Sequence, residues 1–160
     1  MTFELKSLKI HDKMSEETVC FEASMCWNGK RVGFARNSGQ GAPTEWHFDR
    51  REVEAEVMAL AATQPVEFES EFQSRFETIL DEIVYREDNI KQLSKMCRKG
   101  LAYRLKTDPQ GQWTIMNRPY SAELARELKD QHGDALDKIA QEYIAELRLP
   151  RQPAVLGSTT

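Results

Sequence analysis

Hydrophobic and polar residues alternate over much of the N-terminal third of the chain. From residue 19 to residue 27 the odd-numbered positions are all apolar, which is the period of a strand with one buried face. Asn28-Gly29 follows directly, and this dipeptide favours the two positive φ angles of a type I′ turn. We therefore expect a hairpin of residues 19–27 and 30–36 within an antiparallel β-meander of about four strands, the last covering residues 44–48.

The first strand of this meander changes parity along its length. Phe3 and Leu5 occupy odd positions, whereas the next apolar pair, Leu8 and Ile10, occupies even positions. Since successive side chains of a strand point to opposite faces, both pairs reach one core only if the strand is interrupted. We expect a bulge or break near residues 6–7.

Helical periodicity follows the meander. Asp49, with a glutamate three residues later, has the pattern of a capping box, and the helix after it should end before Pro65. Apolar residues then recur at spacings of three, four or seven from Phe68 to Cys97, which predicts a much longer helix. We expect it to end at Gly100, because glycine readily adopts the left-handed conformation found after helices.

The remaining sequence predicts a short β-hairpin and two helices. The hairpin lies within residues 101–117, around a turn at residues 108–111. Ser121 should cap the first helix, and apolar positions from Leu136 to Leu147 define the last one. The fold class is therefore α+β: an N-terminal meander, a helix pair with one long helix, a hairpin and two C-terminal helices.

Length and composition add bounds on organisation and location. A chain of 160 residues with a 40% apolar share can form one domain, which we expect over residues 1–150, with a flexible tail at 151–160. Apolar runs are too short to cross a bilayer, and no secretory signal pattern is present, so we expect a cytoplasmic protein without membrane contact. Three cysteines cannot all pair with one another, which favours free thiols in a reducing compartment.

The glycines of the segment after the hairpin raise the question of a phosphate site. Glycine loops bind phosphate when a strand delivers them to the N-terminus of a helix, whose free N–H groups face the anion. Here Gly39 and Gly41 lead into Pro43 and another strand. We therefore expect an inter-strand turn, and no cofactor.

Candidate catalytic and metal-binding residues are few. His47 shares one strand face with Glu45 and Asp49, a pattern of a metal or acid/base cluster but also of an ordinary solvated face. Cys97 falls on the apolar stripe of the long helix, where thiols are usually buried and inert. We assign no catalytic residue and no metal ligand, and an enzyme with an unrecognised site near His47 is kept as a second alternative.

Charge is unevenly distributed along the chain. Residues 89–118 contain seven basic and one acidic residue, interleaved with aromatic side chains, and such a pattern can hold phosphates while stacking bases. Alternatively, the basic residues can simply stabilise the C-terminal end of a helix, and the aromatic residues can belong to a hydrophobic core. The candidates for nucleic-acid binding are Lys91, Lys95, Arg98, Lys99, Arg104, Lys106, Trp113 and Arg118.

The preceding segment has the opposite charge. Residues 45–88 contain 4 basic and 13 acidic residues, and carboxylates along a helix can dock on a basic surface of another protein. Most acidic helix faces are simply solvated. The candidates for partner binding are Glu69, Glu71, Glu77, Asp81 and Glu82.

Two stretches of the chain resemble small uncharacterised accessory proteins of phages and mobile genetic elements. They are WNGKRVGFARNSGQGAPTEWHF near the N-terminus and YRLKTDPQGQWTIMNRPYSAELARELKDQHGDALDKI near the C-terminus. The resemblance is one of general pattern and assigns no catalytic residue. It implies an accessory protein that acts by binding a host component. Our leading hypothesis is a non-enzymatic protein that docks on a host protein, as an inhibitor of a host or defence protein, and the alternative is a nucleic-acid-binding module.

Overall fold

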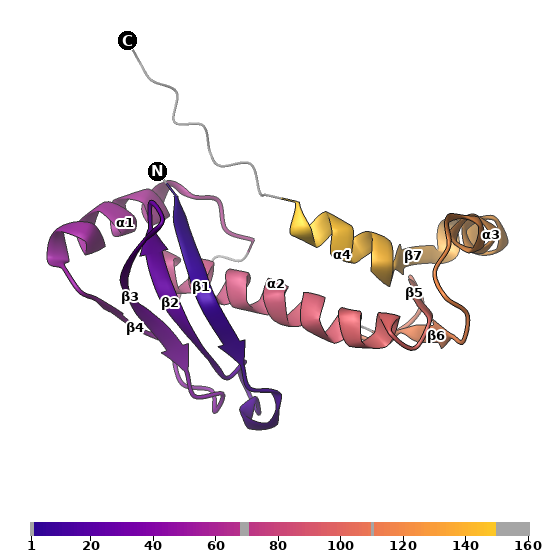
Figure 1. Ribbon diagram of the computed structural model, residues 1–160, viewed down its shortest axis with the longest axis horizontal. Helices are drawn as coiled ribbons and strands as arrows, with labels where there is room; N and C mark the ends of the chain where they lie inside the picture. Colours follow the sequence, from indigo (N-terminus) through magenta and orange to yellow (C-terminus); the bar gives the residue numbers. More distant parts are fainter. Residues whose placement is uncertain (1, 68–70, 110, 150–160) are drawn as a thin grey trace, which may run out of the picture. The chain divides into compact units, whose positions relative to one another are not determined.

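The computed structural model describes residues 2–67, 71–109 and 111–149, so the predicted tail at 151–160 lies outside the described residues (Figure 1). The chain divides into two compact units, Met1–Asp88 and Asn89–Thr160. The boundary falls within the long helix α2 (Arg75–Cys97), which contributes residues to both units. Each unit has a hydrophobic core of its own.

The N-terminal unit begins with the predicted meander. Its antiparallel sheet has the order β1-β2-β3-β4 (Figure 1), with a short 3₁₀ turn at Asp12–Met14 between the first two strands. The strands are β1 (Phe3–Ile10), β2 (Phe21–Trp27), β3 (Lys30–Asn37) and β4 (Glu45–Phe48).

Both special backbone positions predicted in the meander are confirmed. Asn28 and Gly29 connect β2 to β3 with φ angles of 49° and 78°, as a type I′ turn requires. In β1 the register shifts between Lys6 and Lys9, and Ser7 has a φ angle of 53°. The apolar side chains on the two sides of this irregularity consequently pack against the same core: Phe3, Leu5, Leu8 and Ile10.

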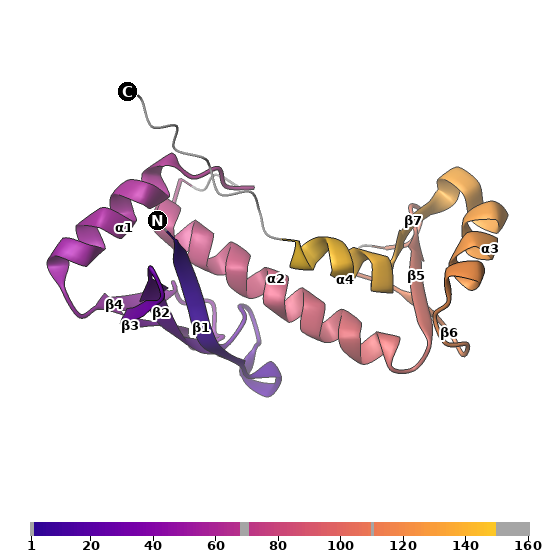
Figure 2. The ribbon, with the colours of Figure 1, turned by 45° about the horizontal axis from the view of Figure 1, so that its top comes forward.

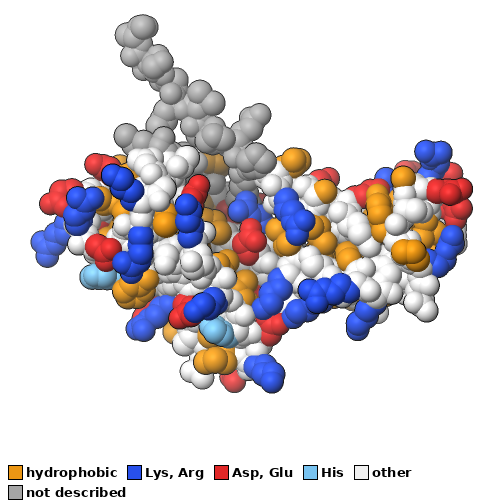
Figure 3. Space-filling model, in the orientation of Figure 1, with side chains coloured by type: hydrophobic (Ala, Val, Ile, Leu, Met, Phe, Trp, Pro, Cys, Tyr) orange, Lys and Arg blue, Asp and Glu red, His pale blue; other side chains and the backbone are white. Residues whose placement is uncertain are grey.

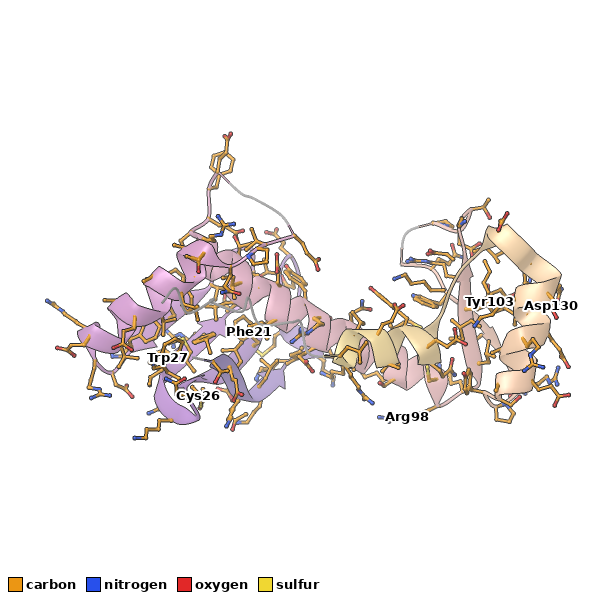
Figure 4. All side chains as sticks on the ribbon, turned by 90° about the horizontal axis from the view of Figure 1, so that it is seen from above. Phe21, Cys26, Trp27, Arg98, Tyr103 and Asp130 are labelled. Carbon is orange, nitrogen blue, oxygen red and sulfur yellow. The ribbon has the colours of Figure 1, made fainter. Side chains whose placement is uncertain are left out.

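Helices cover one face of this sheet. The helix α1 (Arg51–Thr63) and the first half of α2 lie on the same side of the strands (Figure 2), and both contribute buried residues to one core. Phe21 and Trp27 of β2 lie between the strands and these helices (Figure 4). Phe76 of α2 makes an edge-on contact with Trp46, at 5.5 Å between ring centroids.

The predicted capping box at the start of α1 is wrong. Arg50 occupies the N-cap position, and no side chain makes a capping hydrogen bond there. Asp49 interacts with β3 instead: its backbone N–H donates to the Val32 carbonyl at 2.8 Å, and its carboxylate pairs with Arg31 at 3.5 Å. Asp49 therefore extends the pairing with β3 and does not cap α1.

The long helix begins at Arg75 and not at Phe68, which lies outside the described residues. Ser74 explains the later start, because its hydroxyl oxygen accepts a hydrogen bond from the Glu77 N–H at 3.2 Å. Phe72, which we expected on the apolar stripe of the helix, precedes it and is 96% exposed.

The C-terminal unit contains a second antiparallel sheet in the order β6-β5-β7, with helices on both faces. The predicted hairpin and the Ser121 cap are confirmed, since β5 pairs with β6 and the Ser121 hydroxyl accepts from the Leu124 N–H at 3.1 Å. The elements are β5 (Leu101–Leu105), β6 (Thr114–Met116), α3 (Ala122–His132), a 3₁₀ turn (Gly133–Ala135), β7 (Leu136–Ile139) and α4 (Ala140–Arg148).

The strand β7 was not predicted, because the sequence pattern assigned its residues to the last helix. Leu136 and Ile139 have helical spacing, but they pair with β5 as an extended strand, and α4 begins only at Ala140. The sheet separates two cores: Leu101 packs with α3, whereas its neighbour Ala102 packs with α4 and the end of α2. Within the described ranges, no helix has the length and apolar character needed to span a membrane.

Candidate functional site

The glycine-containing loop between β3 and β4 is bonded to the rest of the N-terminal unit. Gly39 and Gly41 have φ angles of 85° and 77°. The Gly39 N–H donates to the Asn37 side chain at 2.8 Å, and the Gly41 N–H donates to the Thr18 hydroxyl at 3.3 Å. The loop leads into β4, as predicted. Its glycines allow the positive φ angles of the loop, and the N–H groups of Gly39 and Gly41 both donate to side chains of the same chain.

A network of polar side chains extends from this loop towards α2. Asn37 is only 8% exposed; its amide oxygen accepts from the Thr18 hydroxyl at 2.9 Å, and its amide nitrogen donates to the Ala42 carbonyl at 2.9 Å. The same nitrogen donates to the Thr44 hydroxyl oxygen at 3.2 Å. Thr44 also bonds to residues of α2 and therefore links Asn37 to the helix.

The helix contributes two carboxylates to the network, at positions four residues apart and therefore on one face. The Thr44 N–H donates to Oε1 of Glu77 at 3.0 Å, and the Thr44 hydroxyl donates to Oδ1 of Asp81 at 2.7 Å. Gln73 donates to Oδ2 of Asp81 at 3.1 Å, and more distantly, at 3.5 Å, to Oε1 of Glu77. Both carboxylates are thus held in place by neutral donors.

These residues line a cleft of about 240 Å³ in the N-terminal unit. One side is formed by the loop and by Thr44, and the other by the row Glu77, Asp81 and Tyr85 along α2. Phe72 also lines it. Glu77 is 6% exposed, whereas Tyr85 is 50% exposed, so the row on α2 runs from a buried carboxylate to a half-exposed aromatic ring.

Burial changes the acid–base behaviour of two cleft residues. It raises the pKa of Asp81 above its usual value of 3.8, although the hydrogen bonds from Thr44 and Gln73 oppose this shift. Burial also raises the pKa of Tyr85, and the nearby carboxylates of Asp81 and Asp88 add to that effect. A cation in the cleft would favour the ionised form of Asp81.

The acidic partner-binding candidates do not form one outward-facing group. Glu77 and Asp81 meet in the cleft, Glu71 is exposed on the segment before α2, and Glu69 lies outside the described residues. Glu82 accepts a hydrogen bond from the backbone N–H of Glu67. The sequence interpretation missed the neutral residues of the network; Asn37 and Thr44 have no local signal, because their partners are far away in the sequence.

Two of the nucleic-acid-binding candidates have structural roles in the C-terminal unit. Arg104 forms an ion pair with Asp137 that includes a hydrogen bond from Nε at 2.7 Å, and its guanidinium lies 5.3 Å from the Trp113 ring centroid. Trp113 packs against a hydrophobic core. These contacts hold the Arg104 and Trp113 side chains within the unit and limit their use for stacking on bases.

The other basic candidates are placed differently. Lys91 is half-buried, and Lys95 lies 3.5 Å from the Gln92 side-chain oxygen. Arg98 projects from the ribbon at the end of α2, whereas the labelled Tyr103 belongs to β5 (Figure 4). The exposed basic candidates are Lys95, Arg98, Lys99, Lys106 and Arg118, of which Arg118 lies 3.8 Å from Glu127.

His47 is exposed on the outer face of the N-terminal sheet, 5.6 Å from the Phe34 ring. Its two acidic neighbours in the sequence pair with arginines: Glu45 with Arg36 at 2.7 Å and Asp49 with β3 as described above. Basic and acidic side chains are interspersed over the N-terminal strands (Figure 3). Among the residues that the structure describes, no three His, Cys, Asp or Glu side chains gather to hold a metal ion.

All three cysteines are free thiols in the structure. Cys20 and Cys26 are buried in the N-terminal unit. Burial raises the pKa of the Cys97 thiol, which lowers the fraction of reactive thiolate at neutral pH.

Comparisons of the chain with protein families, with curated proteins and with solved structures found no match. No relative therefore links the chain to phages or mobile elements, and that context stays a prediction from sequence pattern. The geometry of the cleft and the distribution of charge are the features of the chain that bear on its function.

Proposed function

We propose that the chain is a non-enzymatic binding protein that docks on another protein through the cleft of its N-terminal unit. The observation that carries this proposal is the pair of carboxylates, Glu77 and Asp81, held by neutral donors beside two exposed aromatic residues. The described lining of the cleft includes no His, Cys, Ser or Lys, and the Thr44 hydroxyl, which donates to Asp81, is buried within the network.

The charge of the unit supports a basic partner. Residues 1–88 contain 10 basic and 18 acidic residues, a net charge of −8, whereas residues 89–160 contain 12 basic and 8 acidic residues, a net charge of +4. A negative unit attracts and orients a positive surface during association. The resemblance to accessory proteins of phages and mobile elements adds a context to the proposal, in which the partner is a host or defence protein that is inhibited by being occupied.

Affinity capture with a double variant tests this function. The wild-type chain, Glu77→Gln/Asp81→Asn and the control Glu87→Gln, which changes an exposed carboxylate of the same helix, are immobilised and exposed to nuclease-treated host lysate. We expect one defined protein to be retained by the wild type and the control and lost with the double variant. Retention of that protein by all three would show that it does not dock at the cleft, and recovery of no protein would contradict the proposed function.

A second candidate function is nucleic-acid binding by the C-terminal unit, favoured by the exposed lysines and arginines at the end of α2 and in the following hairpin. Phosphate contacts would weaken steeply with added salt. We expect Arg98→Glu/Lys99→Glu to abolish binding of labelled single-stranded DNA or RNA in anisotropy measurements, whereas the control Arg126→Glu, an exposed arginine of α3, keeps most of it. Binding that does not weaken with added salt, or that Arg98→Glu/Lys99→Glu leaves unchanged, would exclude this region as the nucleic-acid-binding site.

A further inference from the structure

From the geometry of the cleft we infer that it receives the guanidinium group of an arginine side chain of the partner protein. The inference rests on the proposed docking function and names the chemical group that the cleft recognises. It follows from one carboxylate oxygen, from the aromatic ring of Tyr85 and from the volume of the cleft.

The first step concerns Glu77, whose side chain is almost completely removed from solvent. Its Oε1 accepts from the Thr44 N–H and from Gln73. No group in the described ranges donates to its Oε2, although the residue is 6% exposed and lines the cleft. Oε2 is not among the fully buried oxygens without a partner, so it stays accessible, and a cationic donor that enters the cleft can form a charge-assisted hydrogen bond with it.

The second step concerns the chemical type of the cation. Metal ions such as Ca²⁺ take six to eight oxygen ligands. Among the described residues, no group of three or more His, Cys, Asp or Glu side chains lies close enough to hold a metal ion. Both oxygens of Asp81 already accept hydrogen bonds from Thr44 and Gln73. An organic cation that uses Glu77 directly and the charge of Asp81 at longer range therefore suits the site better than a metal ion.

The third step separates arginine from lysine. A planar guanidinium can donate to a carboxylate with one edge while its face stacks on an aromatic ring. Tyr85, which lines the cleft and is 50% exposed, provides such a ring. An ammonium group has no flat face, so it would use the carboxylates and gain less from the ring.

The fourth step concerns size and rigidity. Pockets for drug-sized ligands measure roughly 300–1,000 Å³, and this cleft, at about 240 Å³, is smaller. It therefore suits one side chain that projects from a partner surface. The network of Asn37 and Thr44 fixes the carboxylates before binding, which lowers the ordering cost of association.

The test uses N-acetyl-arginine amide as the probe and follows the amide resonances of the ¹⁵N-labelled full-length chain. We expect saturable shifts at Thr44 and Tyr85, and none with N-acetyl-citrulline amide, which has nearly the same shape without the charge. Glu77→Gln should weaken binding of the probe by about tenfold, because it replaces the charged acceptor. The control Glu87→Gln should leave the affinity within a factor of about two.

Several results would overturn the inference: equal binding of the citrulline probe, equal binding by Glu77→Gln, or no shift of cleft resonances. Tyr85→Ala gives a second variant if Glu77→Gln fails to fold, because Tyr85 is half-exposed and its loss should weaken the arginine probe several-fold while leaving the Thr44 bonds intact. Free arginine is titrated in parallel, and tighter binding of it than of the blocked amide would assign the site to a metabolite. No partner protein is present, so failure here is distinct from failure of the capture experiment.

Discussion

At the scale of single residues, Thr44 holds the candidate site together. It is 3% exposed, donates to both carboxylates of α2 and accepts from Asn37. A hydroxyl group is both donor and acceptor, so this one side chain links an amide to a carboxylate. The loop and the helix consequently share a polar contact that no apolar side chain of the same shape can replace.

We expect Thr44→Val to lower the free energy of unfolding by about 1–3 kcal/mol, because it leaves Asp81 Oδ1 and the Asn37 amide each short of a partner. Denaturant unfolding followed by circular dichroism measures the loss. Thr114→Val, at an exposed position of β6, is the matched control and should change stability by no more than about 0.5 kcal/mol. Equal effects of the two substitutions would contradict the assigned role of Thr44.

The raised pKa of Asp81 predicts a pH dependence with a definite sign. The folded protein holds this proton more tightly than the unfolded chain, so the residue favours folding most below its ordinary pKa of 3.8. As the pH rises above 3.8 and through the raised value, the stability of the wild type should fall relative to that of Asp81→Asn. Chemical unfolding of both proteins across this range gives the stability of the wild type minus that of Asp81→Asn, and an increase of this value with pH would contradict the burial effect.

At the scale of elements, the loop between β3 and β4 depends on its glycines for steric reasons. A Cβ atom at Gly39 would come within 2.1 Å of the Met14 carbonyl oxygen, and its φ of 85° is unfavourable for any other residue. Gly111 has nearly the same φ, 83°, but no described atom lies within 4 Å of its Cβ position. Substitution of Gly111 therefore tests the backbone strain alone, whereas substitution of Gly39 adds the steric overlap.

We therefore expect Gly111→Ala to cost about 1–2 kcal/mol through the positive φ alone. Gly39→Ala should cost about 1–3 kcal/mol more, because the loop must also move away from Met14. Thermal and denaturant unfolding of both variants provide the comparison. Similar losses at the two positions would show that the loop is not tightly fixed against the segment before β2.

The sequence patterns predicted those elements whose signals are local. The turn at Asn28-Gly29 and the irregularity in β1 could be predicted, because turns and strand faces depend on neighbouring residues. The start of α2 was also readable, since Ser74 and Glu77 have the spacing of a capping box, but the apolar stripe extending back to Phe68 outweighed it. β7 was not readable, because pairing with β5 decides its conformation.

The candidate site was predictable only in part for the same reason. Glu77 and Asp81 were identified by their charge as candidates for partner binding, together with other acidic residues of the segment, but the burial of Glu77 was not predicted. Their partner Thr44 lies 33 and 37 residues away in the sequence, and only the fold brings it to α2. A threonine between a proline and a strand carries no pattern that would indicate this contact.

At the scale of the whole molecule, charge and packing divide at the same place. The boundary between the two compact units coincides with the change from a net negative to a net positive sequence. The hydrophobic core of the N-terminal unit extends as far as Val84, and those of the C-terminal unit begin at Ile90. α2 contributes to both units, which have one and two hydrophobic cores, and a single cooperative domain over residues 1–150 stays a prediction.

Two core truncations test whether these units open independently. Leu80 and Leu101 are both 0% exposed, one in each unit, and truncation of a buried leucine to alanine costs about 2–5 kcal/mol. Local opening free energies determine native-state hydrogen exchange. We expect Leu80→Ala to accelerate exchange in β2, β3 and α1 while leaving β5 and α3 protected, and Leu101→Ala to do the reverse. If either substitution instead accelerates exchange evenly from β1 to α4, the two units unfold together, as the single domain that the length and composition of the chain predict.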